Sequence, residues 1–209
     1  MGRILVLAGV NGAGKSSLLG TLLEARGLSW YNPDAFTRAL VQAGWVEAEA
    51  NAMAWHEGTR RLRQAMADGS DFAFESTLGG NTIPRLLGEA CASHEVAIWF
   101  CGLDSVDLHV ERVAARVSRG GHDIPQDKIR ARYDASRENL IDLLPSLAEL
   151  HVYDNSAPLD EQGRADPRPL LQLDRDGLHY PVSVAELLHT PDWAKPIVMR
   201  AMELHAGAA

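Results

Sequence analysis

The chain has 209 residues, 46% of them hydrophobic, which is enough for one globular domain with a sizeable core. Its formal net charge of −8 argues against a general affinity for nucleic acid or anionic membranes, so we expect neither as a partner. No apolar run is long enough to span a bilayer. Because Cys91 and Cys101 are the only cysteines and lack metal-type spacing, a reduced cytoplasmic location is the simpler interpretation.

Residues 9–16, GVNGAGKS, fit the phosphate-binding pattern G-x-x-x-x-G-K-[ST]. An apolar run from Ile4 to Ala8 precedes the motif and predicts a buried parallel strand rather than a signal peptide. After the motif the sequence predicts a helix, which ends at Gly27. Its helical spacing is carried by Leu18, Leu19, Leu22 and Leu23. The motif therefore stands between a strand and a helix, which is the context it requires.

The residue types of this loop suit a bound polyphosphate. Gly12 and Gly14 allow backbone N–H groups to turn onto phosphate oxygens, and the helix starting near Lys15 adds its positive end. Lys15 should contact the β- and γ-phosphates, and the Ser16 hydroxyl should ligate Mg²⁺. The expected nucleotide-binding residues are Gly9, Val10, Asn11, Gly12, Ala13, Gly14, Lys15, Ser16 and Ser17.

Two acidic residues follow predicted strands, at the sheet edge where open α/β folds bind ligands. Residues 28–31 predict a second strand, and Asp34 stands just beyond it. Asp34 is either a general base facing a substrate hydroxyl or a cap of the helix predicted from Ala35 to Ala43. Residues 72–74 predict a third strand that leads into Glu75. Glu75 is a candidate to hold Mg²⁺ through water or to accept a hydrogen bond from a substrate hydroxyl; the alternative is a purely structural role.

A basic segment follows a fourth strand, predicted from Val96 to Cys101. From Arg112 to Arg137 the chain has seven Arg or Lys and three Asp, a local balance of +4 in a protein of −8. Two predicted helices flanking Gly120 and Gly121 suit a lid whose arginines neutralise charge on a transferred phosphoryl group. The alternative is an exposed helix pair laced with salt bridges.

The remaining elements complete a P-loop architecture. Residues 151–155 predict a fifth strand, and residues 170–180 predict a β-hairpin. We expect an α/β, three-layer P-loop NTPase or kinase fold with a parallel five-stranded sheet, a helical lid at about 112–137 and a C-terminal β-hairpin. Residues 1–209 are expected to form one domain, with an appendage at about 157–209.

The sequence lacks the signatures of two large P-loop classes. An LSGGQ-like segment, typical of ABC-type ATPases, and an Asn-Lys-x-Asp guanine reader, typical of GTPases, are both missing. What remains is a phosphate loop, an acidic residue beyond the second strand and an arginine-bearing lid. This is the plan of a small-molecule kinase.

An ordered set of segments covering about residues 3–156 resembles the zeta-toxin family, in its short bacterial branch often labelled predicted ABC-type ATPase. The segments are Gly9 to Ser17, Asn32-Pro33-Asp34, Phe74 to Thr77, Arg119 to Pro125 with Arg130 to Tyr133, and Tyr153 to Ser156. Zeta toxins use ATP and Mg²⁺ to phosphorylate the sugar 3′-hydroxyl of UDP-N-acetylglucosamine. The resemblance therefore implies a kinase that acts on a hydroxyl of a nucleotide sugar, and it implies an antitoxin protein as a candidate partner.

The resemblance also implies roles for individual residues. Asp34 matches the catalytic base, and Glu75 with Thr77 matches an element that contacts the substrate. Arg119 and Arg132 have the family's spacing of thirteen residues between two lid arginines. The implied catalytic residues are Asp34, Lys15, Arg119 and Arg132, with Arg116 at the nucleotide.

Three functional hypotheses follow. The leading one is an ATP-dependent kinase for a hydroxyl of a nucleotide sugar or similar metabolite. The second is a nucleotide-dependent switch or binding module with weak hydrolysis, in which Asp34 is only a cap. The third, nucleic-acid binding through the basic lid, is disfavoured by the net charge of −8.

Overall fold

The structure is a computed structural model that describes residues 1–17, 20, 29–121, 123–160 and 165–205. The helix expected after the phosphate loop lies largely outside the described residues, together with its four leucines and Gly27. Leu28 of the expected second strand also lies outside them. None of the described helices combines the length and apolar character needed to cross a bilayer.

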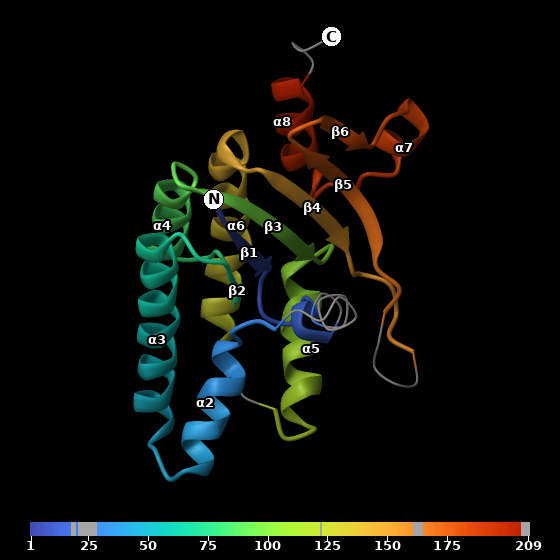
Figure 1. The fold of residues 1–209 in the computed structure, drawn as a ribbon. Helices are drawn as coiled ribbons and strands as arrows, with labels where there is room; N and C mark the ends of the chain where they lie inside the picture. The colour runs from blue at the N-terminus through green and yellow to red at the C-terminus, as the bar shows by residue number, and fades with distance from the viewer. Residues whose placement is uncertain (18–19, 21–28, 122, 161–164, 206–209) are drawn as a thin grey trace.

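A six-stranded sheet in the order β2-β1-β3-β4-β5-β6 forms the centre of the molecule (Figure 1). The strands are β1 (Gly2–Ala8), β2 (Phe72–Ser76), β3 (His94–Gly102), β4 (Glu149–Asp154), β5 (Arg168–Asp174) and β6 (Gly177–Tyr180). The first four strands of that order pair in parallel, and β5 and β6 continue the sheet in antiparallel pairing. The predicted α/β P-loop fold and its C-terminal hairpin are therefore confirmed, and the hairpin is part of the main sheet.

The expected second strand is reduced to a single bridge. Tyr31 bridges Phe74 in parallel, donating its N–H to Ala73 and accepting from the N–H of Glu75. The pairing ends there because Pro33, two residues on, has no N–H to donate and begins the next helix. The parallel part of the sheet consequently has four strands and this bridge instead of five strands.

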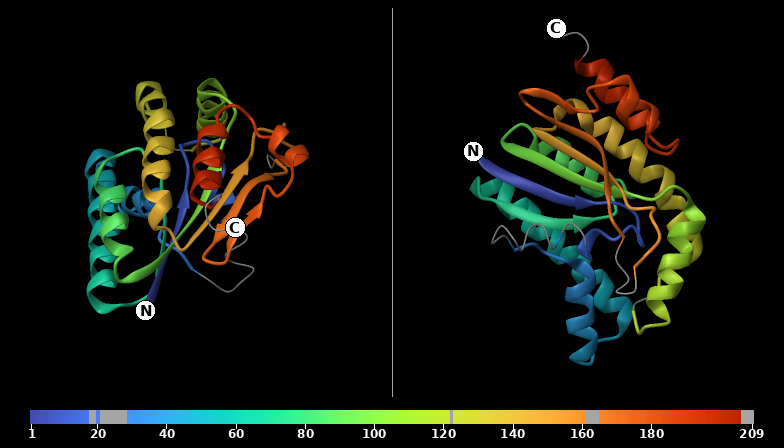
Figure 2. Two further views of the ribbon diagram at one scale, coloured as in Figure 1. Left: turned by 90° about the horizontal axis from the view of Figure 1, so that it is seen from above. Right: turned by 90° about the vertical axis from the view of Figure 1, so that its right-hand side faces the viewer.

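The described helices lie mainly beside the sheet and beyond its carboxyl edge (Figures 1 and 2). They are α2 (Pro33–Gln42), α3 (Glu47–Asp68), α4 (Thr82–Ala90), α5 (Val106–Val117), α6 (Gln126–Leu143), the 3₁₀ turn η1 (Leu144–Ser146), α7 (Val184–Leu188) and α8 (Lys195–His205). Glycines follow two of these helices: Gly44 comes after α2 at φ +93°, and Gly69 caps α3 at φ +66°.

The two faces of β1 belong to different cores because side chains alternate along a strand. Ile4 and Val6 join the large core that α3, α4, α6 and α8 cover. Leu5 and Leu7 join a smaller core on the opposite face. The C-terminal appendage contributes to the large core through Trp193, whose ring lies against β3. The burial of β1 on both faces explains why its sequence is a continuous apolar run.

The basic segment forms the two helices expected of a lid. Helix α5 begins at the N-cap Ser105, whose Oγ accepts from the N–H of Leu108 at 3.2 Å. The N–H of the preceding residue, Asp104, donates to Ser156 Oγ at 2.7 Å. Gly120 has φ +84° in the connection to α6. Helices α5 and α6 stand side by side beyond the sheet edge, with α6 running back along the large core (Figure 2).

Candidate active site

The phosphate loop has the backbone conformation that its glycines predict. Gly9, Gly12 and Gly14 have φ of +135°, +87° and +88°, a region that residues with a Cβ rarely enter. A Cβ at Gly9 would lie 2.1 Å from the carbonyl oxygen of Cys101, and one at Gly12 would lie 2.7 Å from that of His109. The loop therefore packs too closely against β3 and α5 for any side chain at these two positions.

Lys15 stands in the first helical turn after this loop. Its Nζ donates to the carbonyl oxygen of Val10 at 3.4 Å, so the ammonium folds back over the loop. Burial lowers the pKa of Lys15, and the nearby carboxylates of Glu75 and Asp34 oppose that shift. A phosphate bound in the loop would add negative charge at the same place and would further favour the ammonium form.

Glu75 is buried at the end of β2 and accepts three hydrogen bonds. Ser16 Oγ donates to its Oε2 at 2.9 Å, and Trp30 Nε1 and Asn32 Nδ2 each donate to its Oε1 at 2.8 Å. Hydroxyl and carboxylate oxygens suit Mg²⁺, which keeps several waters and phosphate oxygens as its other ligands. The Ser16–Glu75 pair fits such an ion.

Asp34 lies in the first turn of α2 and is not its cap. The cap is Asn32, whose side-chain oxygen accepts from the N–H of Ala35 at 3.0 Å. The capping alternative for Asp34 was therefore wrong. The carboxylate is 40% exposed and lies 3.7 Å from a guanidinium nitrogen of Arg116 on α5. Asp34 is thus a solvent-accessible carboxylate held beside the lid.

The lid arginines occupy different places. Arg132 on α6 donates to the side-chain oxygen of Asn11 in the phosphate loop at 2.7 Å, which brings its guanidinium to the loop. Burial lowers the pKa of Arg132, and Asp34 opposes the shift. Arg116 reaches Asp34, as described above. Arg119, by contrast, is exposed in the turn after α5 and does not line the cavity beside the loop. The structure therefore brings Arg116 and Arg132 to the site and leaves Arg119 outside it.

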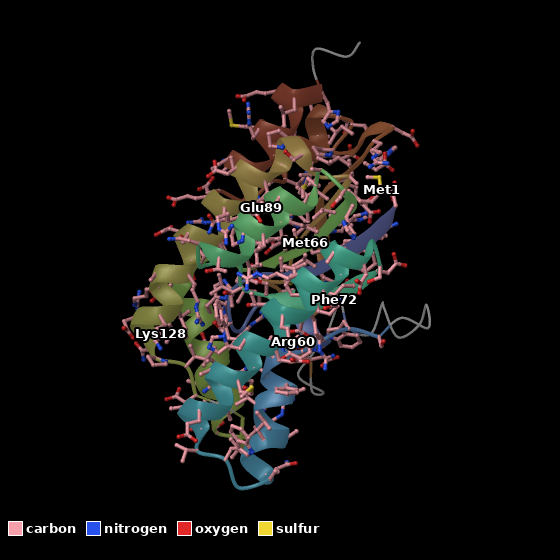
Figure 3. All side chains as sticks on the ribbon, turned by 60° about the vertical axis from the view of Figure 1, so that its left-hand side comes forward. Met1, Arg60, Met66, Phe72, Glu89 and Lys128 are labelled. Atoms are coloured by element: carbon pink, nitrogen blue, oxygen red, sulfur yellow. The ribbon has the colours of Figure 1, made fainter. Side chains whose placement is uncertain are left out.

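A cavity of about 660 Å³ connects the phosphate loop with α2 and α3. The predicted site residues among its lining are Asn11, Lys15, Asp34, Glu75, Thr77 and Arg132. Tyr31, Asn51 and Trp55 also line it, as does Lys128 in the first turn of α6. Lys128 is labelled in Figure 3. Arg60, in contrast, forms an ion pair with Glu57 on the exposed side of α3. The volume lies within the roughly 300–1,000 Å³ typical of small-molecule sites.

No protein-family profile matches the chain. An uncharacterized protein of Haemophilus influenzae (strain ATCC 51907 / DSM 11121 / KW20 / Rd) is 26% identical over 140 residues, which cover 63% of this chain and 92% of that protein. A chain of the AvrRxo1-ORF1:-ORF2 crystal structure with ATP superposes with a TM-score of 0.66 at 15% identity, covering 91% of this chain and 63% of that chain. A chain from the PezAT chromosomal toxin–antitoxin system of Streptococcus pneumoniae superposes with a TM-score of 0.55 at 14% identity, covering 97% of this chain and 86% of that one.

The chain has a zeta-toxin-like P-loop kinase fold. The expected resemblance is thereby confirmed at the level of the fold. In this P-loop kinase fold, the cavity lies between the loop, the edge of the sheet and the lid, outside the carboxyl ends of the strands.

Three residues that shape the site had no role predicted from the sequence. Asn32 precedes Pro33 at a helix start, a recognisable capping signal, and it also binds Glu75. Asn155 Nδ2 donates to the carbonyl of Ala13 at 2.9 Å, and His109 Nδ1 donates to that of Asn11 at 2.9 Å. No local pattern identifies Asn155 or His109, because each reaches the loop from a distant element.

His109 gives the P-loop kinase fold a pH-dependent stability. Burial lowers its pKa from 6.5 to about 4, so the folded protein takes up this proton less readily than the unfolded chain. The stability that the neutral His109 contributes is fully present above pH 6.5. As the pH falls toward 4, the free energy of unfolding decreases by about 3 kcal/mol in total. Urea unfolding at pH 7.0 and pH 4.5 should show a smaller pH dependence for His109→Gln than for the wild type. An equal pH dependence of the two proteins would contradict the assignment.

Proposed function

We propose that the protein is an ATP-dependent small-molecule kinase that transfers the γ-phosphate to a hydroxyl group. The observation that carries this proposal is the shared cavity: the Asp34 carboxylate lines the same 660 Å³ space as Lys15 and Arg132. A phosphate site with cations on one side and an accessible carboxylate on the other suits transfer between two bound molecules.

The roles follow from the positions of the side chains. The phosphate-loop N–H groups and Lys15 bind the β- and γ-phosphates, and Arg132 contacts the transferred group. The Ser16 hydroxyl with Glu75 behind it would hold Mg²⁺, which neutralises phosphate charge when it is bound. Asp34 orients the acceptor hydroxyl and takes its proton as the new oxygen–phosphorus bond forms and the bond to ADP breaks. Arg116 holds the carboxylate of Asp34 in place.

We further propose a nucleotide sugar such as UDP-N-acetylglucosamine as the acceptor. The cavity is also lined by Asn51 and Trp55, both exposed, which offer an amide and an indole ring to a large polar molecule. Thr77 lines the cavity beside Glu75 and is proposed to contact the sugar. The resemblance to zeta toxins supports this choice, and the PezAT likeness supports an antitoxin as a protein partner.

An acceptor screen tests the proposal. The protein is incubated with ATP, Mg²⁺ and a panel of nucleotide sugars, nucleosides and free sugars, and the products are analysed by mass spectrometry. We expect one nucleotide sugar to gain a phosphoryl group in amounts equal to the ADP released. Release of ADP and inorganic phosphate alone, with every panel member unchanged, would favour a nucleotide-dependent switch instead.

The proposed role of Arg132 predicts a rate defect. Arg132→Ala should lower kcat by about 10²-fold with a smaller effect on ATP affinity, because the guanidinium acts mainly on the charge of the transferred phosphoryl group. Steady-state kinetics measures both quantities. Arg130→Ala is the matched control, since Arg130 lies on the same helix and pairs with Asp107 at the surface. An Arg132→Ala enzyme with the wild-type kcat would refute the assignment.

The kcat of Arg119→Ala, measured in the same assay, tests whether the lid closes over bound ATP. Arg119 lies outside the cavity, so the catalytic role that the zeta-toxin resemblance implies for it requires the lid to move when ATP binds. A loss of kcat similar to that of Arg132→Ala is expected on this proposal. A wild-type rate for Arg119→Ala would identify Arg119 as a surface residue.

A further inference from the structure

The loop from Ser76 to Gly80 carries a buried residue in an uncommon backbone conformation. Leu78 has φ of +54° and is 1% exposed. This left-handed region is unusual for a bulky side chain, so the surroundings must hold the loop in place. Two contacts come from the loop itself: Ser76 Oγ accepts from the N–H of Leu78 at 3.0 Å, and Thr77 Oγ1 accepts from that of Gly79 at 3.3 Å.

Further contacts with this loop come from the lid helix α6. Asn139 Nδ2 donates to the carbonyl oxygen of Leu78 at 2.6 Å and also reaches that of Gly80 at 3.3 Å. A Cβ at Gly79 would lie 2.5 Å from Cγ of Arg132, so the loop packs directly on that arginine as well. Arg132 and Asn139 are about two helical turns apart and therefore share one face of α6.

The loop is also part of the cavity wall. Residues 76–80 all line the 660 Å³ cavity, and they follow Glu75 without a break. Asn139 does not line the cavity, so it acts on bound molecules only through the loop. One helix thus carries the arginine that contacts the phosphate loop and the asparagine that bonds the Ser76–Gly80 wall of the cavity.

We propose that Asn139 is a positioning residue. It holds the Ser76–Gly80 loop with Leu78 in the left-handed conformation, and it thereby places Thr77 against the acceptor. This inference rests on the proposed kinase function. The amide of Asn139 is suited to the task because its Nδ2 has two N–H groups for two carbonyl oxygens. Loss of the amide should therefore weaken acceptor binding. ATP binding, which depends on the phosphate loop, should be unaffected.

Two measurements on Asn139→Ala and Asn139→Asp test the inference. The aspartate has the same shape but only acceptor oxygens when ionised, so it cannot donate to the carbonyls. Each variant should raise the KM for the acceptor roughly three- to tenfold, with the KM for ATP and kcat within about twofold of the wild type. Amide hydrogen exchange of residues 76–80 should become faster in both variants. Glu138→Ala, at the exposed neighbouring position on α6, is the matched control and should change neither quantity.

The outcomes separate this inference from the proposed function. Unchanged exchange of the loop amides in both variants overturns the inference whether or not an acceptor is known. Faster exchange with an unchanged acceptor KM overturns it too, because Asn139 then stabilises the loop without positioning the acceptor. If the wild-type enzyme phosphorylates no acceptor, the kinase proposal fails, and the positioning role fails with it. The exchange data then report only that Asn139 holds the loop.

Discussion

Lys15→Ala is expected to abolish measurable phosphoryl transfer and to weaken ATP binding. The half-buried side chain folds back over the phosphate loop and lines the cavity, so its removal takes away the cation next to the bound phosphates. Charge contacts in a shielded site act most strongly on the transition state, and we expect a loss of at least about 10³-fold in kcat/KM. Transfer rate and nucleotide affinity are measured on the same preparation, and circular dichroism confirms that the variant is folded.

Lys195→Ala provides the control for this substitution. Lys195 is one of the chain's three lysines, and it pairs with Asp192 on the surface at α8. Its removal should leave transfer unchanged. If a folded Lys15→Ala protein transfers phosphate at the wild-type rate, the assignment of residues 9–16 as a phosphate-binding loop is wrong.

Asp34→Asn is expected to reduce transfer by roughly 10²–10⁴-fold, the usual range for loss of general-base assistance. The substitution keeps the shape of the side chain. Helix α2 should be unaffected, because its cap is Asn32. The ion pair with Arg116 joins two partly exposed groups and contributes at most about 1 kcal/mol. ATP affinity and melting temperature should therefore stay close to the wild-type values while the rate falls.

Asp107→Asn is the control for Asp34→Asn, since Asp107 is an exposed carboxylate paired with a lid arginine outside the cavity. It should transfer phosphate normally. Wild-type transfer by Asp34→Asn would mean that another group accepts the proton. Glu75 is the next candidate, although its two oxygens already accept three hydrogen bonds in the structure.

The parts of the fold with a local signal were predictable. The phosphate loop needs glycine at three positive-φ positions, and the sequence has glycine at each of them. The turn from Asp174 to Gly177 and its apolar flanks predicted the hairpin. The strand expected at residues 28–31 was wrong because an apolar run is only one requirement. A strand must also continue beside its partner, and Pro33 turns the chain into a helix after one bridge at Tyr31.

The residue types of the site were predictable from the sequence, but the contacts between its side chains were less so. Lys15, Ser16 and Glu75 stand next to strands and helices whose order the sequence reveals, so their meeting at one sheet edge could be foreseen. The contact of Arg132 with the phosphate loop, and of Asn139 with the Leu78 carbonyl, depends on how α6 rests across the sheet. Such packing is decided by tertiary contacts and leaves no short-range pattern.

The central claim is that the γ-phosphate passes to a hydroxyl held by Asp34 and not to water. The most direct measurement follows the label from γ-³²P-ATP in the presence of the acceptor found by the screen, and compares labelled acceptor with labelled inorganic phosphate. Most of the label should appear on the acceptor in the wild type, and Asp34→Asn should lower this transfer by roughly 10²–10⁴-fold while still binding ATP. Label found only in inorganic phosphate, at equal rates in the wild type and Asp34→Asn, would contradict it.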